Sequence, residues 1–302
     1  YLRLERKLAK FFGAETAVLT NSGYVTNLIV AQAFTGQFSH ALIDQRAHTA
    51  LKDAAELLHC PVIRFNHRDV TDFARALARC GKAARPVLLT DGMYAQNGSA
   101  APLAEYLKLL PPDGMIIVDE AHGAGTLGAR GRGTVEFAKV SRRRIVQNIT
   151  LSKAFGVYGG AVLGAKSLRP RLTQTRLFIG STPLPLPLAF AAETAIDLLA
   201  TDQKFRAQLD AKATYIKQEL HKVGYPMAAF PGPIVPVQLR TRAANKKLQA
   251  ALLKAKILPP FLQYPGGPAT GYFRFVICSE HTKRQLDHLV RVLSPFAKNV
   301  VG

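Results

Sequence analysis

Cysteine is scarce in this sequence, and acidic residues are half as frequent as basic ones. The 302 residues contain three cysteines, Cys60, Cys80 and Cys278, with no C-x-x-C pair and no even number that would build a disulfide framework. We therefore expect a reducing, cytoplasmic location.

Long apolar runs are also lacking. The most apolar segment, residues 183–200, is interrupted by prolines and by Glu193 and Asp197, so we do not expect it to cross a membrane. No charged and then apolar leader opens the sequence, which begins at Tyr1 rather than at methionine. A content of 48% hydrophobic and 20% charged residues disfavours a disordered or fibrous protein and predicts one or two globular domains.

The charge balance is strongly basic. Forty Lys and Arg residues against 20 Asp and Glu give a formal charge of +20, which can attract nucleic acid, acidic lipid or a polyphosphate substrate. The basic residues are scattered, however, and a nucleic-acid partner is only a remote alternative. The one tight cluster, Arg142 to Arg144, precedes an apolar strand, and we expect it to be a solvated loop.

Short apolar segments alternate with helical patterns along the first half of the chain. Leu4, Leu8 and Phe11 share one helical face that Gly13 is placed to end, and Asp69 is placed to cap a further helix. Strands are predicted over residues 16–20, 41–44, 61–65, 86–90, 115–119 and 144–150. Strands that are apolar throughout and alternate with helices are typical of a mostly parallel sheet covered on both faces.

The domain organisation follows from a change in this pattern. Residues 1–185 are predicted to form the large α/β domain, and residues 186–222, after the proline-rich STPLPLPL, a connecting helix. Residues 223–302 are predicted to form a small C-terminal α+β domain, with strands at 233–239 and 272–279 and helices at 243–256 and from Thr282.

The segment from Met115 to Gly133 contains the letters of two nucleotide-binding patterns. VDEAH resembles a helicase box, but the only Gly-Lys pair, Gly81-Lys82, lacks the upstream glycine and the following Ser or Thr of a phosphate loop. GAGTLG fits the dinucleotide pattern, but four residues separate it from the strand and ARGRG is a poor helix start. Both interpretations are therefore excluded.

Polar side chains do follow the ends of two strands. Asp119 ends one strand, with His122 three residues on, and Thr150, Ser152 and Lys153 lie at or just past the end of the next. One β-α-β crossover separates the two groups, so they can converge on one crevice. A lysine beside a carboxylate suits pyridoxal 5'-phosphate (PLP), because the lysine forms the Schiff base and the acid keeps the pyridine nitrogen protonated.

Seven motifs together resemble the α-oxoamine synthases, which have the aspartate-aminotransferase-like fold of PLP enzymes (PLP fold type I, aminotransferase class I/II). They occur in family order over nearly the whole chain: NSGYVTN, IDQRAHTALKD, IRFNHRD, TDGMYAQNGSAAPL, IVDEAHGAGTLGARGRG, TLSKAFGVYGG and FRFVICSEHT. The segment that precedes YLRLERKLAKFFGAE in this family is expected to be absent from the sequence.

The resemblance implies a role for each matching residue. Lys153 would carry the cofactor, Asp119 would pair with the pyridine nitrogen, His122 would donate toward the phenolic oxygen, and His48 would stack on the ring. The remaining cofactor contacts implied are Ser22, Gly23, Tyr24, Thr150, Ser152 and Ser181. Independently, the NSGY segment before a helix offers unpaired amides, which form a ready anion site.

Substrate and assembly are also implied by the resemblance. Arg274 would bind the carboxylate of the amino acid, and Ser181 would reach the phosphate in a neighbouring subunit, so a homodimer with a shared active site is expected. No metal ion is predicted. Ala95 stands where the family usually has a serine, and Gly180 and Pro183 depart from its usual S-T-S-x-P-P.

The hypothesis is a PLP-dependent acyltransferase that joins an amino acid to an acyl-CoA thioester with loss of CO₂, giving an α-oxoamine. An aminotransferase or an aldolase-type lyase could use the same residues, and would act without any acyl-CoA. A non-catalytic or nucleic-acid-binding protein is the remaining alternative.

Overall fold

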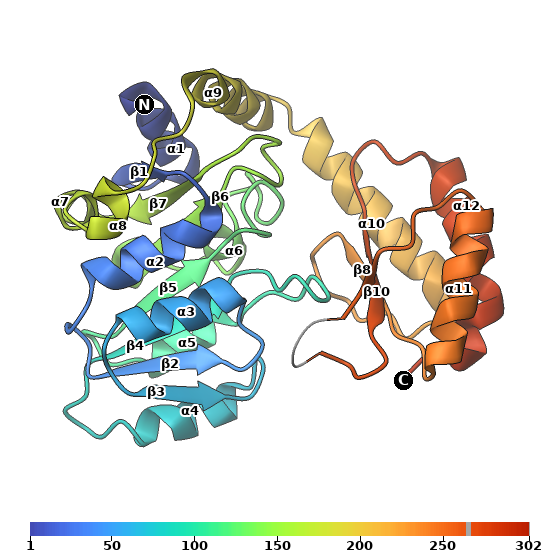
Figure 1. Ribbon diagram of the computed structural model, residues 1–302, viewed down its shortest axis with the longest axis horizontal. Coiled ribbons are helices and arrows are strands. Elements are labelled where there is room, and N and C mark those ends of the chain that lie inside the picture. Colours follow the sequence, from blue (N-terminus) through green and yellow to red (C-terminus); the bar gives the residue numbers. More distant parts are fainter. Residues whose placement is uncertain (264–266, 302) are drawn as a thin grey trace. The chain divides into compact units, whose positions relative to one another are not determined.

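The structure, a computed structural model, describes residues 1–263 and 267–301. It contains two compact units, and Figure 1 labels their elements. The first unit comprises Tyr1–Tyr94 and Ala100–Asp202, and the second comprises Ala95–Ser99 and the residues from Gln203 onward.

A seven-stranded sheet forms the centre of the first unit, in the order β1-β7-β6-β5-β4-β2-β3. The strands are β1 (Thr16–Thr20), β2 (His40–Asp44), β3 (Val62–Phe65), β4 (Pro86–Asp91), β5 (Met115–Asp119), β6 (Ile145–Thr150) and β7 (Gly160–Gly164). The pairs from β3 to β6 are parallel, and β7 pairs antiparallel with both β6 and β1. The mostly parallel sheet that was predicted is therefore confirmed.

Helices cover both faces of this sheet because alternate side chains of each buried strand point to opposite faces. Val87, Leu89 and Ile117 pack on the face covered by α2 (Gly23–Ala33), α3 (Thr49–Leu57) and α7 (Leu168–Thr173). Leu88 and Ile116 pack on the opposite face, with α4 (Val70–Ala78) and α5 (Leu103–Leu109). Farther along that face lie α1 (Leu2–Phe12) and α9 (Leu186–Thr201). The short elements α6 (Thr134–Phe137), η1 (Arg142–Arg144) and α8 (Arg176–Ile179) complete the unit.

The second unit has its own core and an antiparallel sheet, in the order β8-β10-β9. Its strands are β8 (Ile234–Val237), β9 (Phe261–Leu262) and β10 (Tyr272–Val276). Its helices are α10 (Lys204–Lys222), α11 (Arg242–Lys254), α12 (Lys283–Leu293) and η2 (Ser294–Asn299). The α+β character expected of this part of the chain is confirmed.

The helix ends follow the local signals in the sequence. Gly13 ends α1 in the left-handed conformation, with φ of 66°, and the Asp69 side chain accepts a hydrogen bond from the backbone N–H of Asp72 at the start of α4. Within the described ranges no helix has the length and apolar composition needed to span a bilayer.

Three local expectations differ from the structure. The segment 186–222 is two helices, α9 and α10, because Asp202 between them has an extended backbone. Strand β7 was not predicted. The cluster from Arg142 to Arg144 is a 3-10 helix rather than a solvated loop, and Arg142 is half-buried. Arg144 donates hydrogen bonds to the backbone carbonyls of Leu107, Leu110 and Pro111.

Candidate active site

The carboxyl ends of β4, β5 and β6 lie side by side and carry buried polar residues. Asp91 ends β4 and pairs in register with Asp119, which ends β5, and Asp119 pairs in turn with Asn148 of β6. All three side chains are at most 5% exposed. Ligands of open α/β sheets bind beyond these strand ends, so this edge of the first unit is the candidate site.

Asp119 is held by a chain of amide hydrogen bonds. Its Oδ2 accepts from Asn27 Nδ2 at 2.7 Å, and its Oδ1 accepts from the backbone N–H of Ala121 at 2.9 Å. Asn148 Nδ2 donates to Asn27 Oδ1 at 2.8 Å, which fixes the orientation of the Asn27 amide. A carboxylate that is buried and held by two donors is a fixed negative charge, suited to pairing with a cationic ring nitrogen.

Lys153 and His122 meet beside this carboxylate. Lys153 Nζ lies 2.9 Å from His122 Nε2, and the charges of both Lys153 and Asp119 act on His48. Lys153 is exposed, in the turn after β6, whereas His122 is half-buried in the turn after β5. The register of β5 with β6 thus brings the predicted lysine, histidine and aspartate to one edge of the sheet.

His48 caps the start of helix α3 (Thr49–Leu57), and Asp91 at the end of β4 holds its backbone in place. Its backbone N–H donates to Asp91 Oδ2 at 2.8 Å, and its Nδ1 accepts from the backbone N–H of Ala50 at 3.2 Å. Partial burial, with a smaller contribution from Lys153, lowers the pKa of His48 below its ordinary value. The imidazole is therefore neutral at pH 7, with its proton on Nε2 because Nδ1 is an acceptor.

The start of helix α2 forms a cradle against the end of β6. Ser22 caps α2 by accepting from the Val25 N–H at 3.2 Å, and the next residue, Gly23, packs against Thr150. A Cβ at Gly23 would lie 2.6 Å from Thr150 Cβ, so only glycine allows this close approach. Thr150 Oγ1 lies 2.6 Å from Ser152 Oγ, which adds two hydroxyls to the amides of the helix start.

The other predicted residues lie elsewhere in the chain. Ser181 follows α8, and its hydroxyl donates to the carbonyl of Leu177. Arg274 belongs to the second unit, in β10, where its Nη1 donates to the carbonyl of Ala95 at 3.3 Å. Ala95, the position that departs from the family pattern, thus contacts the predicted carboxylate-binding arginine.

Three residues of this site were given no role from the sequence. Asn27 and Asn148 orient Asp119 although 92 and 29 residues separate them from it along the chain, a relation that no local pattern indicates. Asp91 could have been found, because it ends a buried strand as Asp119 does.

Comparisons with known proteins agree with this geometry. The model of the family "Aminotransferase class I and II" matches residues 1–293. The 8-amino-7-oxononanoate synthase of Thermosipho melanesiensis is 33% identical over 301 residues, which cover 98% of this chain and 77% of that protein. The protein of the same name from Hahella chejuensis is 33% identical over 305 residues, covering 99% and 77%.

Solved structures agree as well. Serine palmitoyltransferase of Sphingomonas wittichii superposes with a TM-score of 0.90 at 27% identity, covering 98% of this chain and 75% of that one. The 8-amino-7-oxononanoate synthase of Francisella tularensis, at 23% identity and a TM-score of 0.86 over 98% and 87% of the two chains, supports the fold alone. The chain therefore belongs to the aminotransferase class I and II family, and its relatives there are α-oxoamine synthases.

Proposed function

We propose that this protein is a PLP-dependent acyltransferase that condenses an amino acid with an acyl-CoA thioester, with loss of CO₂, to an α-oxoamine. The observation that carries the proposal is the grouping of Lys153, His122 and Asp119 next to the cradle at the start of α2. Relatives named 8-amino-7-oxononanoate synthase and serine palmitoyltransferase support the reaction class.

The residues of the first unit fit PLP by their chemistry. Its phosphate needs N–H and O–H donors, which Gly23, Tyr24, Thr150 and Ser152 would supply. Because Gly23 has no side chain, Thr150 can lie directly against the start of α2. The ring nitrogen of PLP needs a fixed carboxylate, which Asp119 supplies. His48 would lie on the ring, and the Lys153 amine would bind the cofactor covalently.

When bound, PLP supplies a cationic ring that takes up electrons from the α-carbon of the amino acid. The Asp119 carboxylate, which Asn27 and Ala121 hold in place, would balance that positive charge. The Lys153 amine would remove the α-proton of the amino acid as general base, and it would later return a proton to the product. His122, 2.9 Å from Lys153, holds that amine in position.

Arg274 is proposed to bind the carboxylate of the amino acid. A guanidinium has five N–H donors in a planar fork, and Arg274 uses one nitrogen on the Ala95 carbonyl, so paired donors are left for a carboxylate. Ala95 lacks the hydroxyl of the serine that the family usually has, so the preferred substrates are proposed to differ from those of the relatives.

A homodimer in the cytoplasm is proposed as the working form. The resemblance to the family implies that Ser181 would reach the phosphate site of the neighbouring subunit. In this structure Ser181 is half-buried and follows α8. Three free cysteines in the described chain suit a reducing compartment.

An aminotransferase is the second candidate, because the matching family model is that of the class I and II aminotransferases. The two activities differ in their co-substrate. An aminotransferase converts the amino acid to an oxoacid without any thioester, whereas the proposed enzyme releases CO₂ and free CoA only when an acyl-CoA is present.

The decisive experiment is a visible absorption titration of the PLP-loaded protein with glycine, alanine and serine in turn, followed by acyl-CoA thioesters of increasing length. The expected result is a cofactor band that shifts with one amino acid, and CoA release that needs both substrates. Oxoacid formation without thioester would assign an aminotransferase. A folded protein that gives no cofactor band would overturn the enzyme assignment.

A further inference from the structure

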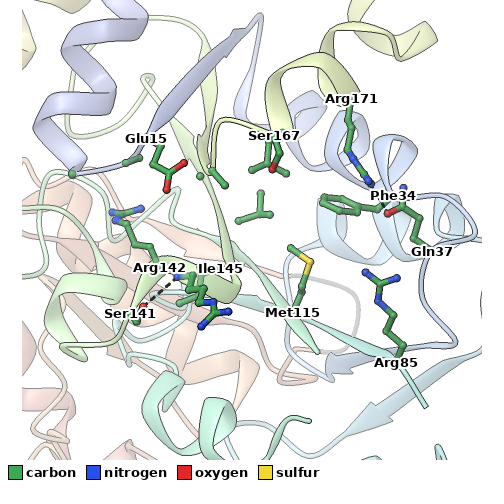
Figure 2. Close-up of a pocket in the computed structure, with 17 residues that line it drawn as sticks. Glu15, Phe34, Gln37, Arg85, Met115, Ser141, Arg142, Ile145, Ser167 and Arg171 are labelled. Carbon is green, nitrogen blue, oxygen red and sulfur yellow. Dashed lines mark hydrogen bonds between the residues drawn. The ribbon is translucent and has the colours of Figure 1, made fainter. Parts of the chain in front are cut away.

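A cavity of about 570 Å³ lies in the first unit, away from the candidate active site. Figure 2 displays its lining: Arg85 and Arg171 lie on one side with Phe34 and Gln37, and Arg142 lies on the other with Ser141. The volume falls in the range typical of sites for small molecules.

The cavity lies at the opposite edge of the sheet from Asp119 and Thr150. Arg85 directly precedes β4, Met115 and Ile145 are the first residues of β5 and β6, and Gly164 is the last residue of the antiparallel β7. Strands of five or six residues span roughly 17 to 20 Å, and the sheet itself separates the two sites. A ligand here would not be one that reacts at Lys153.

The charge of the lining is unbalanced. Four guanidinium groups, from Arg85, Arg142, Arg143 and Arg171, face the cavity together with a single carboxylate, Glu15. Glu15 accepts from the backbone N–H of Lys166, and no ion pair joins any of the four arginines to an acid among residues 1–263 and 267–301. Glu120 and Glu136 lie near enough for their charges to act on Arg142, but neither lines the cavity. Four guanidinium groups around one carboxylate repel one another, and an anionic ligand would neutralise them.

Arg142 gives the most specific indication. Its Nη1 is buried and has no acceptor in the described part of the chain, although a buried donor normally has a partner. Burial also lowers the pKa of Arg142. Because guanidinium groups bind phosphate through paired N–H donors, a phosphate oxygen is the acceptor that best suits this group.

The opposite side of the cavity combines charge with an aromatic ring. The Arg171 guanidinium lies 5.8 Å from the centre of the Phe34 ring, and Gln37 accepts a hydrogen bond from Arg171. Arg85 lies 5.7 Å from the ring centre of Phe38, beside the cavity. A ligand with a planar apolar part could place that part against this side of the cavity while its phosphate groups contact Arg142.

From these observations we propose that the cavity binds a small molecule bearing two or more phosphate groups, separately from the reaction at Lys153. The arginines would bind the phosphates, and the Phe34 side would receive an organic part if the ligand has one. Inorganic pyrophosphate and a nucleoside diphosphate share this chemistry, and the test distinguishes them.

The test is calorimetric titration of the protein, kept in excess PLP so that the cradle at α2 is filled, with pyrophosphate and with ADP. The expected result is binding that weakens at least tenfold in R142Q/R171Q. Because Arg142 is half-buried, R85Q/R171Q is a second variant that changes only exposed residues. Tighter binding of ADP than of pyrophosphate would assign an organic ligand, and the reverse order an inorganic one.

The matched control is R79Q/R284Q, which removes the same charge from two exposed arginines outside the cavity lining. It should bind both ligands as the parent does. Phenylglyoxal labelling read by mass spectrometry localises the site, since pyrophosphate should protect Arg142 and Arg171 but not Arg79. Equal weakening in the control, equal affinity in every variant, or no protection of Arg142 would overturn the proposal.

Discussion

Asp91 and Asp119 are the last register pair between β4 and β5, so their side chains leave neighbouring strands on the same face of the sheet. Both are 5% exposed. Burial, and the nearby charge of Asp119, raise the pKa of Asp91 well above its ordinary value. Asp119 has the N–H donors of Asn27 and Ala121, so we assign the proton of this pair to Asp91.

This assignment predicts different results for two substitutions of Asp91. Asp91→Asn keeps an oxygen for the His48 N–H and the shape of a neutral carboxyl, so kcat/KM should stay within about threefold of the parent value. Asp91→Ala leaves that N–H without its acceptor and frees His48, and kcat/KM should fall at least tenfold. Steady-state kinetics near pH 7 measure both. An Asn variant as impaired as the Ala variant would show that Asp91 acts as an anion.

Asn27→Ala should weaken cofactor binding through its effect on Asp119. The change removes a buried donor to Asp119 and the acceptor of Asn148, and buried groups left unpaired cost about 1–3 kcal/mol each. The PLP dissociation constant, measured by absorbance, should rise about tenfold or more, together with a loss of stability.

The control for this change is Asn245→Ala in the second unit. Asn245 is 3% exposed and donates to the Thr270 carbonyl at 2.7 Å, so its loss should also destabilise the protein. PLP affinity should be unchanged in that variant. A similar fall in affinity in both variants would mean that Asn27 acts only through general stability.

The sheet could be predicted from the sequence because its signals are local. Each predicted strand of the first unit is an apolar run of four to seven residues, and all six lie within one residue of β1 to β6. Strand β7, with glycine at both ends, gives no such signal, and its burial comes from pairing with β1 and β6.

The part of the candidate site that could be predicted consists of residues at strand ends and in the family motifs. Asp119, Thr150 and Lys153 follow from their positions at or after strand ends, whereas Asn27 depends on a helix packing across the sheet. The η1 segment was predicted to be a solvated loop because the carbonyl acceptors of Arg144, at the end of α5 and just after it, lie more than 30 residues away along the chain. Contacts of that range are set by the tertiary fold.

Lys153→Ala tests the proposed base. Removing a general base typically costs 10²- to 10⁴-fold, and loss of the covalent link to the cofactor adds to this, so kcat should fall at least about 10³-fold. Lys166→Ala, at an exposed position after β7, is the matched control and should keep parental activity. Condensation of amino acid and thioester at the parental rate by the Lys153 variant would refute this role.

Glu120, in the loop that carries His122, should make the free energy of unfolding depend on pH. Its carboxyl is fully buried and accepts hydrogen bonds from the Thr134 N–H and hydroxyl, the Val135 N–H and the Gln147 amide. Burial outweighs these donors and raises the pKa of Glu120 from 4.5 to about 7. Because the folded state then holds the proton more tightly than the unfolded state, the free energy of unfolding should fall as pH rises from 4.5 to 7.

Glu120→Gln should remove this pH dependence while keeping the contacts. The Gln oxygen can accept from the backbone N–H groups of Thr134 and Val135, and its amide can donate to the Thr134 hydroxyl. Urea unfolding of both proteins should give a stability difference, parent minus variant, that declines by about 3 kcal/mol between pH 4.5 and 8. Glu120→Ala, which leaves those donors unpaired, should be destabilised at every pH. A difference between parent and Gln variant that stays constant with pH would mean that Glu120 is ionised throughout this range, with its four hydrogen bonds outweighing its burial.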